Sequence, residues 1–173
     1  MFSRQPGSSG CHKGRLKARY MPQISETFRK ELALPDLDAT ARLGASIADG
    51  LQLGDAVALW GELGAGKTTL ARAILTALGV TEEVPSPTFT LVQSYDTHPK
   101  VSHYDFYRLK SGRELDELGF DDALSEGAVL VEWPERAPEA LPPEALHVRL
   151  GARNGARTAR LTGPLRWESL IHV

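Results

Sequence analysis

The chain has 173 residues, of which 42% are apolar and 24% are charged, and its formal net charge is −2 at pH 7. This composition is typical of a one-domain globular protein, and it provides no overall basic field to recruit nucleic acid. A single cysteine excludes the disulfide-stapled secreted class. Since no apolar run approaches the roughly 20 residues that span a bilayer, and no secretory signal opens the chain, we expect a cytoplasmic protein without membrane contact.

The first twenty residues differ in charge from the rest of the chain. They hold five basic residues and no acidic one, whereas residues 21–173 hold 15 basic and 22 acidic residues, or a net −7. Glycine and serine at positions 7–10, with few apolar residues around them, predict that residues 1–20 are a basic, disordered extension. Three interpretations of it are open: an upstream segment before a true start at Met21, a native arm, or an organellar transit peptide.

From Ile24 onward, short apolar runs alternate with helical patterns. Asp38 is a candidate N-cap for a helix whose apolar stripe ends at Leu51, with Gly50 near its end. Residues 56–60 are predicted to form a buried strand. A glycine-rich turn follows, and the next helix is predicted over residues 68–78.

The second half of the chain predicts two hairpins and a second buried strand. In chain order, we expect strands at 89–95 and 101–107, short helices at 113–118 and 121–125, a buried strand at 128–132, and strands at 146–150 and 157–161. This mixture favours the α/β class. The predicted fold is a three-layer α/β/α P-loop NTPase fold, with a mostly parallel central sheet and added antiparallel hairpins.

Gly61 to Thr68 has the sequence GELGAGKT, which fits the phosphate-binding pattern G-x-x-x-x-G-K-[ST] between a strand and a helix. Glycines let successive backbone N–H groups turn toward phosphate oxygens, and the helix start adds its positive dipole end. Lys67 is expected to reach the β- and γ-phosphates of ATP, and the Thr68 hydroxyl to ligate Mg²⁺. The expected nucleotide contacts in this stretch are Glu62, Leu63, Gly64, Ala65, Gly66, Lys67, Thr68 and Thr69.

A phosphate-binding loop also needs a carboxylate for magnesium, ordinarily at the end of a neighbouring buried strand. Glu132 follows four apolar residues and meets that requirement, although Asp is commoner there; the alternative is a solvated strand-end glutamate. Asp105 shares a predicted strand face with His103 and Tyr107, so it is a candidate to hold a magnesium-bound water or to orient the attacking water. The alternative is a plain His103–Asp105 hydrogen bond.

Two other features have a functional and a structural interpretation. Thr88 lies in a Ser-Pro-Thr segment, and in switch-type nucleotidases such a threonine senses the γ-phosphate or its metal; the alternative is a proline turn. The tryptophans Trp60 and Trp133 are predicted as core residues. A basic hairpin is predicted to be a solvated face, with an RNA or protein contact as the alternative; its arginines are Arg149, Arg153, Arg157 and Arg160.

The sequence lacks the motifs that identify several other classes of P-loop protein. The chain has no N-K-x-D segment of a GTPase and no L-S-G-G-Q stretch of a transporter ATPase. A small-molecule P-loop kinase remains possible by size, as does a binding module that senses ATP without hydrolysing it.

Four blocks, Gly61 to Leu70, Ser86 to Leu91, His103 to Leu109 and Glu132 to Glu135, closely resemble the TsaE (YjeE) family in order and spacing. These are bacterial ATPases needed for threonylcarbamoyladenosine in tRNA, and the resemblance spans Leu34 to Leu161. It implies a P-loop ATPase domain over residues 21–173 that binds ATP with Mg²⁺ and hydrolyses it slowly alone.

The resemblance also implies partners and residue roles. The partners would be TsaD and TsaB, whose complex transfers threonylcarbamoyl to the adenosine next to the anticodon, so that tRNA is reached only indirectly. The ATP cycle would regulate or reset that complex. Lys67, Asp105 and Glu132 would be catalytic, and Thr68, Glu132 and Asp105 would serve the metal. Thr88 would sense the γ-phosphate, and Thr40 would lie near the nucleotide.

Overall fold

The computed structural model describes residues 27–153 and 156–171. The predicted extension at 1–20 and residues 154–155, between the two strands of the predicted late hairpin, lie outside these ranges. The strands are β1 (Thr27–Leu34), β2 (Ala56–Trp60), β3 (Val92–Tyr95), β4 (Val101–Asp105), β5 (Ala128–Glu132), β6 (Leu146–Arg153) and β7 (Ala156–Pro164). The α-helices are α1 (Leu37–Gly50), α2 (Lys67–Ala77), α3 (Arg113–Glu117) and α4 (Phe120–Glu126), and short 3-10 turns follow β4, β5 and β7.

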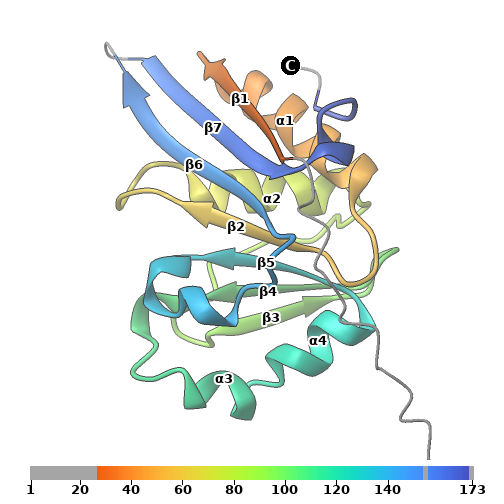
Figure 1. Ribbon diagram of the computed structural model, residues 1–173, viewed down its shortest axis with the longest axis vertical. Coiled ribbons are helices and arrows are strands. Elements are labelled where there is room, and N and C mark those ends of the chain that lie inside the picture. Colours follow the sequence, from red (N-terminus) through yellow and green to blue (C-terminus); the bar gives the residue numbers. More distant parts are fainter. Residues whose placement is uncertain (1–26, 154–155, 172–173) are drawn as a thin grey trace, which may run out of the picture.

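The seven strands form one mixed sheet in the order β1-β7-β6-β2-β5-β4-β3 (Figure 1). The four central strands, β6, β2, β5 and β4, are parallel to one another. β3 pairs antiparallel with β4 at one edge, and β7 and β1 extend the other edge antiparallel. The predicted α/β class, with parallel central strands and added hairpins, is therefore confirmed.

Alternate residues of the central strands pack into two separate apolar clusters. Val57, Leu59 and Leu130 join α1 and α2 on one side of the sheet. Val129 and Val131 join the aromatic residues of β4 and α4 on the other side. β2 and the first four residues of β5 are apolar because both faces of these strands are covered, as is usual for parallel strands. α3 and α4 cover β3 to β5 only, so β6, β7 and β1 project beyond them (Figure 1).

Several predicted boundaries are corrected by local hydrogen bonds. The N-cap of α1 is Asp36, whose side chain accepts from the Ala39 N–H at 2.7 Å, and Asp38 lies inside the first turn. Strand β3 begins at Val92 because the chain turns at Leu91, which has a φ of 65°. The strand at β1 was missed in the sequence because edge strands bury only alternate residues, and its run of Arg, Lys and Glu masks that alternation.

Strand β4 ends at Asp105, two residues earlier than predicted. The Asp105 carboxylate accepts from the Tyr107 N–H at 2.9 Å and caps a 3-10 turn. Asp105 and His103 therefore share a strand face, but Tyr107 does not belong to it. None of the helices in residues 27–153 and 156–171 is long and apolar enough to cross a membrane.

Candidate functional site

The loop between β2 and α2 has the backbone that the glycine pattern predicts. Gly64 and Gly66 have φ values of +79° and +102°, which side-chain-bearing residues rarely adopt. Gly61 has a φ of +142°, and a Cβ there would lie 2.6 Å from the Leu150 carbonyl oxygen of β6. The loop therefore fits closely against β6 and leads directly into the N-terminus of α2, which favours negative charge.

Lys67, the first residue of α2, is held inside this loop. Its Nζ donates to the carbonyl oxygens of Gly61 at 2.6 Å and Glu62 at 2.9 Å, and lies 3.7 Å from the centre of the Trp133 ring. Only 4% of the residue is exposed. Burial lowers the pKa of Lys67, and the negative charges of nearby carboxylates, with Glu132 foremost, oppose that shift. Lys67 is therefore placed among both backbone carbonyl acceptors and acidic side chains.

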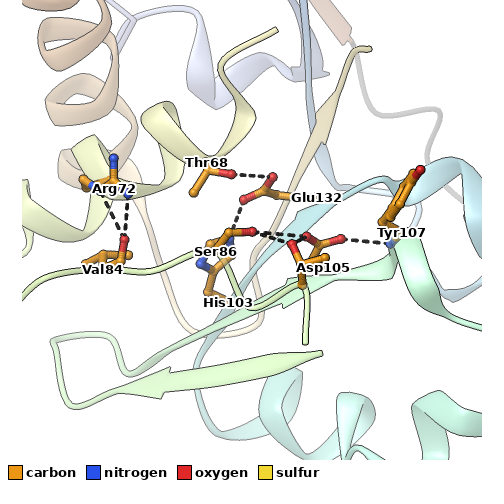
Figure 2. Close-up of polar contacts among 9 residues, drawn as sticks. Thr68, Arg72, Val84, Ser86, His103, Asp105, Tyr107 and Glu132 are labelled. Atoms are coloured by element: carbon orange, nitrogen blue, oxygen red, sulfur yellow. Dashed lines mark hydrogen bonds and ion pairs between the residues drawn. The ribbon is translucent and has the colours of Figure 1, made fainter. Parts of the chain in front are cut away.

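Glu132, at the carboxyl end of β5, connects α2 to β4 (Figure 2). One carboxylate oxygen, Oε2, accepts from the Thr68 hydroxyl at 2.9 Å. The other, Oε1, lies 2.9 Å from Nε2 of His103, whose side chain is fully buried. Because an ionised carboxylate only accepts, Nε2 must carry the proton and donate. His103 Nδ1 has no hydrogen-bond partner within the described part of the chain.

Asp105 ties the Ser-Pro-Thr segment to the end of β4. Its Oδ2 accepts from the Thr88 hydroxyl at 2.7 Å and from the Ser86 hydroxyl at 3.3 Å, while Oδ1 accepts from the Tyr107 N–H (Figure 2). Arg72 of α2 donates twice to the Val84 carbonyl oxygen, at 3.1 and 2.9 Å, just before this segment. The segment is therefore fastened both to α2 and to the sheet.

A cavity of about 210 Å³ lies between the loop, the Ser-Pro-Thr segment and the ends of β4 and β5. Six of its lining residues come from four segments of the chain, namely Lys67, Thr68, Thr88, Asp105, Glu132 and Trp133, with Gly64, Gly66 and Thr69 at its border. Thr68 and the two carboxylates offer the hard oxygen ligands that Mg²⁺ prefers. Residues 27–153 and 156–171 contain no group of three His, Cys, Asp or Glu side chains that could hold a metal alone. A Mg²⁺ site shared with phosphate oxygens fits such a donor set.

Thr40 does not line this cavity. It lies against Ala65, Gly66 and Thr69 in a separate small hollow beside the loop. A larger cavity of about 520 Å³ opens between the loop residues 61–65 and strands β6 and β7, where Arg149 and Arg157 line it. The loop is thus flanked by an acidic cavity and a basic one.

Two residues of the site differ from their predicted interpretation. Trp133 is only partly buried, and its φ of 55° turns the ring back across the loop, where it also contacts the Tyr107 ring at a tilt of 48°, with ring centres 4.8 Å apart. His103 contacts Glu132 of the neighbouring strand, not Asp105. The pairing of β4 with β5 creates that contact between residues 29 apart in the sequence. No local sequence pattern indicates either contact. The one indication in the sequence is that both residues lie in the four blocks that resemble the TsaE family.

Comparison with known proteins gives a consistent result. Residues 34–160 match the family model described as "Threonylcarbamoyl adenosine biosynthesis protein TsaE". A Rickettsia felis protein named tRNA threonylcarbamoyladenosine biosynthesis protein TsaE is 41% identical over 121 residues, covering 69% of this chain and 71% of that protein. A Streptomyces coelicolor protein of the same name is 43% identical over 112 residues, covering 62% and 76%. The crystal structure of YdiB from Bacillus subtilis superposes with a TM-score of 0.63 at 31% identity, covering 86% of this chain and 93% of that one.

Proposed function

The chain belongs to the TsaE family, and from that premise we propose that it is an ATP-binding, slowly ATP-hydrolysing subunit required for threonylcarbamoyladenosine modification of tRNA. In this proposal it acts in the cytoplasm on a complex of TsaD and TsaB. That complex transfers the threonylcarbamoyl group to the adenosine next to the anticodon. The ATP cycle of this chain regulates or resets the complex, and the chain itself is not the transferase.

The observation that carries the proposal is the juxtaposition of Lys67, Thr68 and Glu132 at the start of α2. The loop glycines and the helix N-terminus present N–H groups and positive potential suited to phosphate oxygens. Lys67 would place its charge against the β- and γ-phosphates. Thr68 and Glu132, 2.9 Å apart, would hold Mg²⁺, with Asp105 acting through a bound water. Mg²⁺ supplies neutralisation of the charge that develops on the phosphate oxygens.

Asp105 and Thr88 are the candidates to act on the attacking water. Their oxygens are 2.7 Å apart and line the same cavity as Lys67. A carboxylate there can hold a water in line with the γ-phosphate and accept its proton. Thr88, which is hydrogen-bonded to Asp105, would contact the γ-phosphate. Loss of this phosphate would then make the Ser-Pro-Thr segment less ordered.

The charge around this cavity supports the proposal that the isolated chain turns over slowly. Among the residues that the structure describes, no arginine lines the cavity. Arg108, the nearest candidate in sequence to Asp105, stacks on the Phe89 ring at 4.3 Å. An arginine placed at the γ-phosphate contributes about 10³–10⁵-fold to phosphoryl transfer in other P-loop proteins. We therefore propose that TsaD and TsaB complete the site, either by supplying a cation or by ordering the Ser-Pro-Thr segment.

The direct test of the nucleotide site is the variant Lys67→Ala. Titration calorimetry with Mg²⁺ and a non-hydrolysable ATP analogue should show at least about 100-fold weaker binding, because a buried charge-assisted contact to phosphate is lost. Circular dichroism should show that the variant remains folded. Tight binding by a folded Lys67→Ala protein would contradict the assignment. Transfer of the γ-phosphate to a metabolite instead of water would favour the small-molecule kinase.

A further inference from the structure

On one face of the sheet formed by β6, β7 and β1, polar side chains lie next to one another in rows that run across the strands. The cross-strand register places Arg29, Thr162 and His147 in one row, and Glu31, Arg160, Arg149 and Trp60 in the next. Arg153 lies on the same side of β6, four residues beyond Arg149. We call these eight residues the open face, because α3 and α4, on the same side of the sheet, cover only β3 to β5 (Figure 1).

The open face has an excess of positive charge. Its four arginines are exposed, and Glu31 is the one acidic residue among the eight. Glu31 lies 3.5 Å from Arg153 and 3.3 Å from Arg160. Arg149 and Arg160 are directly opposite each other on β6 and β7. Like charges opposite each other destabilise a sheet. An anion bound between Arg149 and Arg160 would therefore reduce the repulsion between them.

A groove of about 280 Å³ lies within the open face, lined by Trp60, His147, Arg149, Arg160 and Thr162. The Trp60 indole N–H donates to Nδ1 of His147 at 3.0 Å. Since an indole nitrogen only donates, Nδ1 is bare and Nε2 carries the proton. Burial, and then Arg149, lower the pKa of His147. The imidazole is therefore neutral near pH 7 and offers an N–H donor to the groove.

Trp60 provides a flat aromatic surface beside this donor. The Arg149 guanidinium lies 4.9 Å from the centre of the Trp60 ring. The groove thus combines a planar ring, two guanidinium forks, a neutral N–H donor and a hydroxyl. Surfaces that bind single-stranded nucleic acid combine positive charge along the backbone with aromatic rings for the bases in this way.

We propose that the open face binds the phosphate backbone of RNA, with one nucleotide seated in the groove at Trp60. This goes beyond the proposed function, in which tRNA is reached only through the partner complex. Arginine favours this occupant because its fork matches phosphate oxygens and its plane stacks on rings.

An acidic protein surface suits the open face less well. The residues that dominate protein interfaces sit in well-packed, desolvated pockets, whereas Arg153 and Arg160 have 73% and 62% of their side chains exposed. Trp60 is the one large aromatic side chain among the eight residues. The rest of the charge distribution agrees with an anionic polymer at this end of the molecule. The segment 113–126, which forms α3 and α4, holds six acidic residues and one basic residue and lies toward the other end of the sheet (Figure 1).

The test is fluorescence anisotropy of a labelled tRNA anticodon stem-loop, titrated with the chain at several salt concentrations. The double variant Arg153→Gln, Arg160→Gln is preferred to Arg149→Gln, because Arg149 also lines the cavity beside the phosphate-binding loop. The expected result is roughly tenfold weaker binding, with the slope of log K against log salt shallower by about 1.5. The matched control Arg113→Gln, on α3, should bind the RNA as the unsubstituted chain does.

Two results would overturn the proposal. The first is equal RNA binding by the double variant and the unsubstituted chain, or no salt-dependent binding by the latter. The second is displacement of the RNA by poly-L-glutamate as effectively as by unlabelled RNA at equal charge concentration. That second result would assign the open face to an acidic protein partner. Unchanged binding of the ATP analogue by the double variant verifies its fold.

Discussion

The charged residues around the phosphate-binding loop, which we call the loop end of the sheet, are buried, whereas those of the open face are exposed. At the loop end, Lys67, Asp105 and Glu132 are each at most 4% exposed, and every one of them has at least two polar or ring contacts. On the open face, Arg153 and Arg160 have 73% and 62% of their side chains exposed, and both share Glu31.

This difference indicates what each region can do. Buried charges that lack partners destabilise the fold, so the buried charges of the loop end form a fixed hydrogen-bonded network. Exposed charges are stabilised by water and can exchange it for a mobile polyanion at little cost to the fold. Substitutions should therefore alter turnover and stability at the loop end, and change only binding of an external partner at the open face.

The largest effect is expected for Asp105→Asn. The amide preserves the size of the side chain but removes the proton acceptor and the charge beside Thr88. ATP turnover in the presence of TsaD and TsaB should fall about 100- to 1,000-fold. Affinity for the Mg²⁺–ATP analogue, measured by calorimetry, should stay within a few-fold. Retained turnover would show that the attacking water is held elsewhere.

A smaller effect is expected at His103, which positions Glu132 without reaching the cavity. His103→Leu removes the donor to Oε1 and leaves a buried carboxylate oxygen unpaired. The Mg²⁺ concentration for half-maximal analogue binding should rise about tenfold, and unfolding free energy should fall by about 1–3 kcal/mol. His103→Gln, which can place an N–H near the same point, should recover part of both. An unchanged Mg²⁺ requirement in His103→Leu would reduce the role of His103 to packing.

Trp133→Leu is expected to act mainly on stability. The centre of the ring lies 3.7 Å from Lys67 Nζ, and the ring contacts Tyr107, so its loss removes a cation–π contact worth about 1–2 kcal/mol. Urea unfolding should report a loss of this size. Trp133→Phe keeps an aromatic face and should lose less. Equal losses for the two variants would mean that the ring matters only as apolar volume.

The smallest effect is expected for Arg160→Gln at the open face. The side chain is exposed and its ion pair with Glu31 is 3.3 Å long, so unfolding free energy should change by no more than about 0.5 kcal/mol. Basal ATP turnover should match that of the unsubstituted chain. A marked loss of either would show that the two regions are coupled through the sheet, and would break the contrast between them.

Local pattern predicted the loop end well. The glycines, Lys67 and the strand that ends at Glu132 lie in continuous stretches whose residue types specify their own conformation. Local sequence pattern does not predict contacts between residues that only strand pairing brings together. The contact of His103 with Glu132, and the groove at Trp60, need β4 beside β5 and β2 beside β6. The roles of Thr40, Thr88, Asp105 and the other site residues stay predictions.

The central claim is that this chain holds an incomplete ATPase site that its partners complete. Steady-state ATP hydrolysis by the purified chain, alone and with saturating TsaD and TsaB from the same source, tests it most directly. The claim predicts slow turnover by the chain alone and clear stimulation by the pair, since no arginine is among the described residues that line the 210 Å³ cavity. Fast turnover alone that is the same with and without the pair would contradict it.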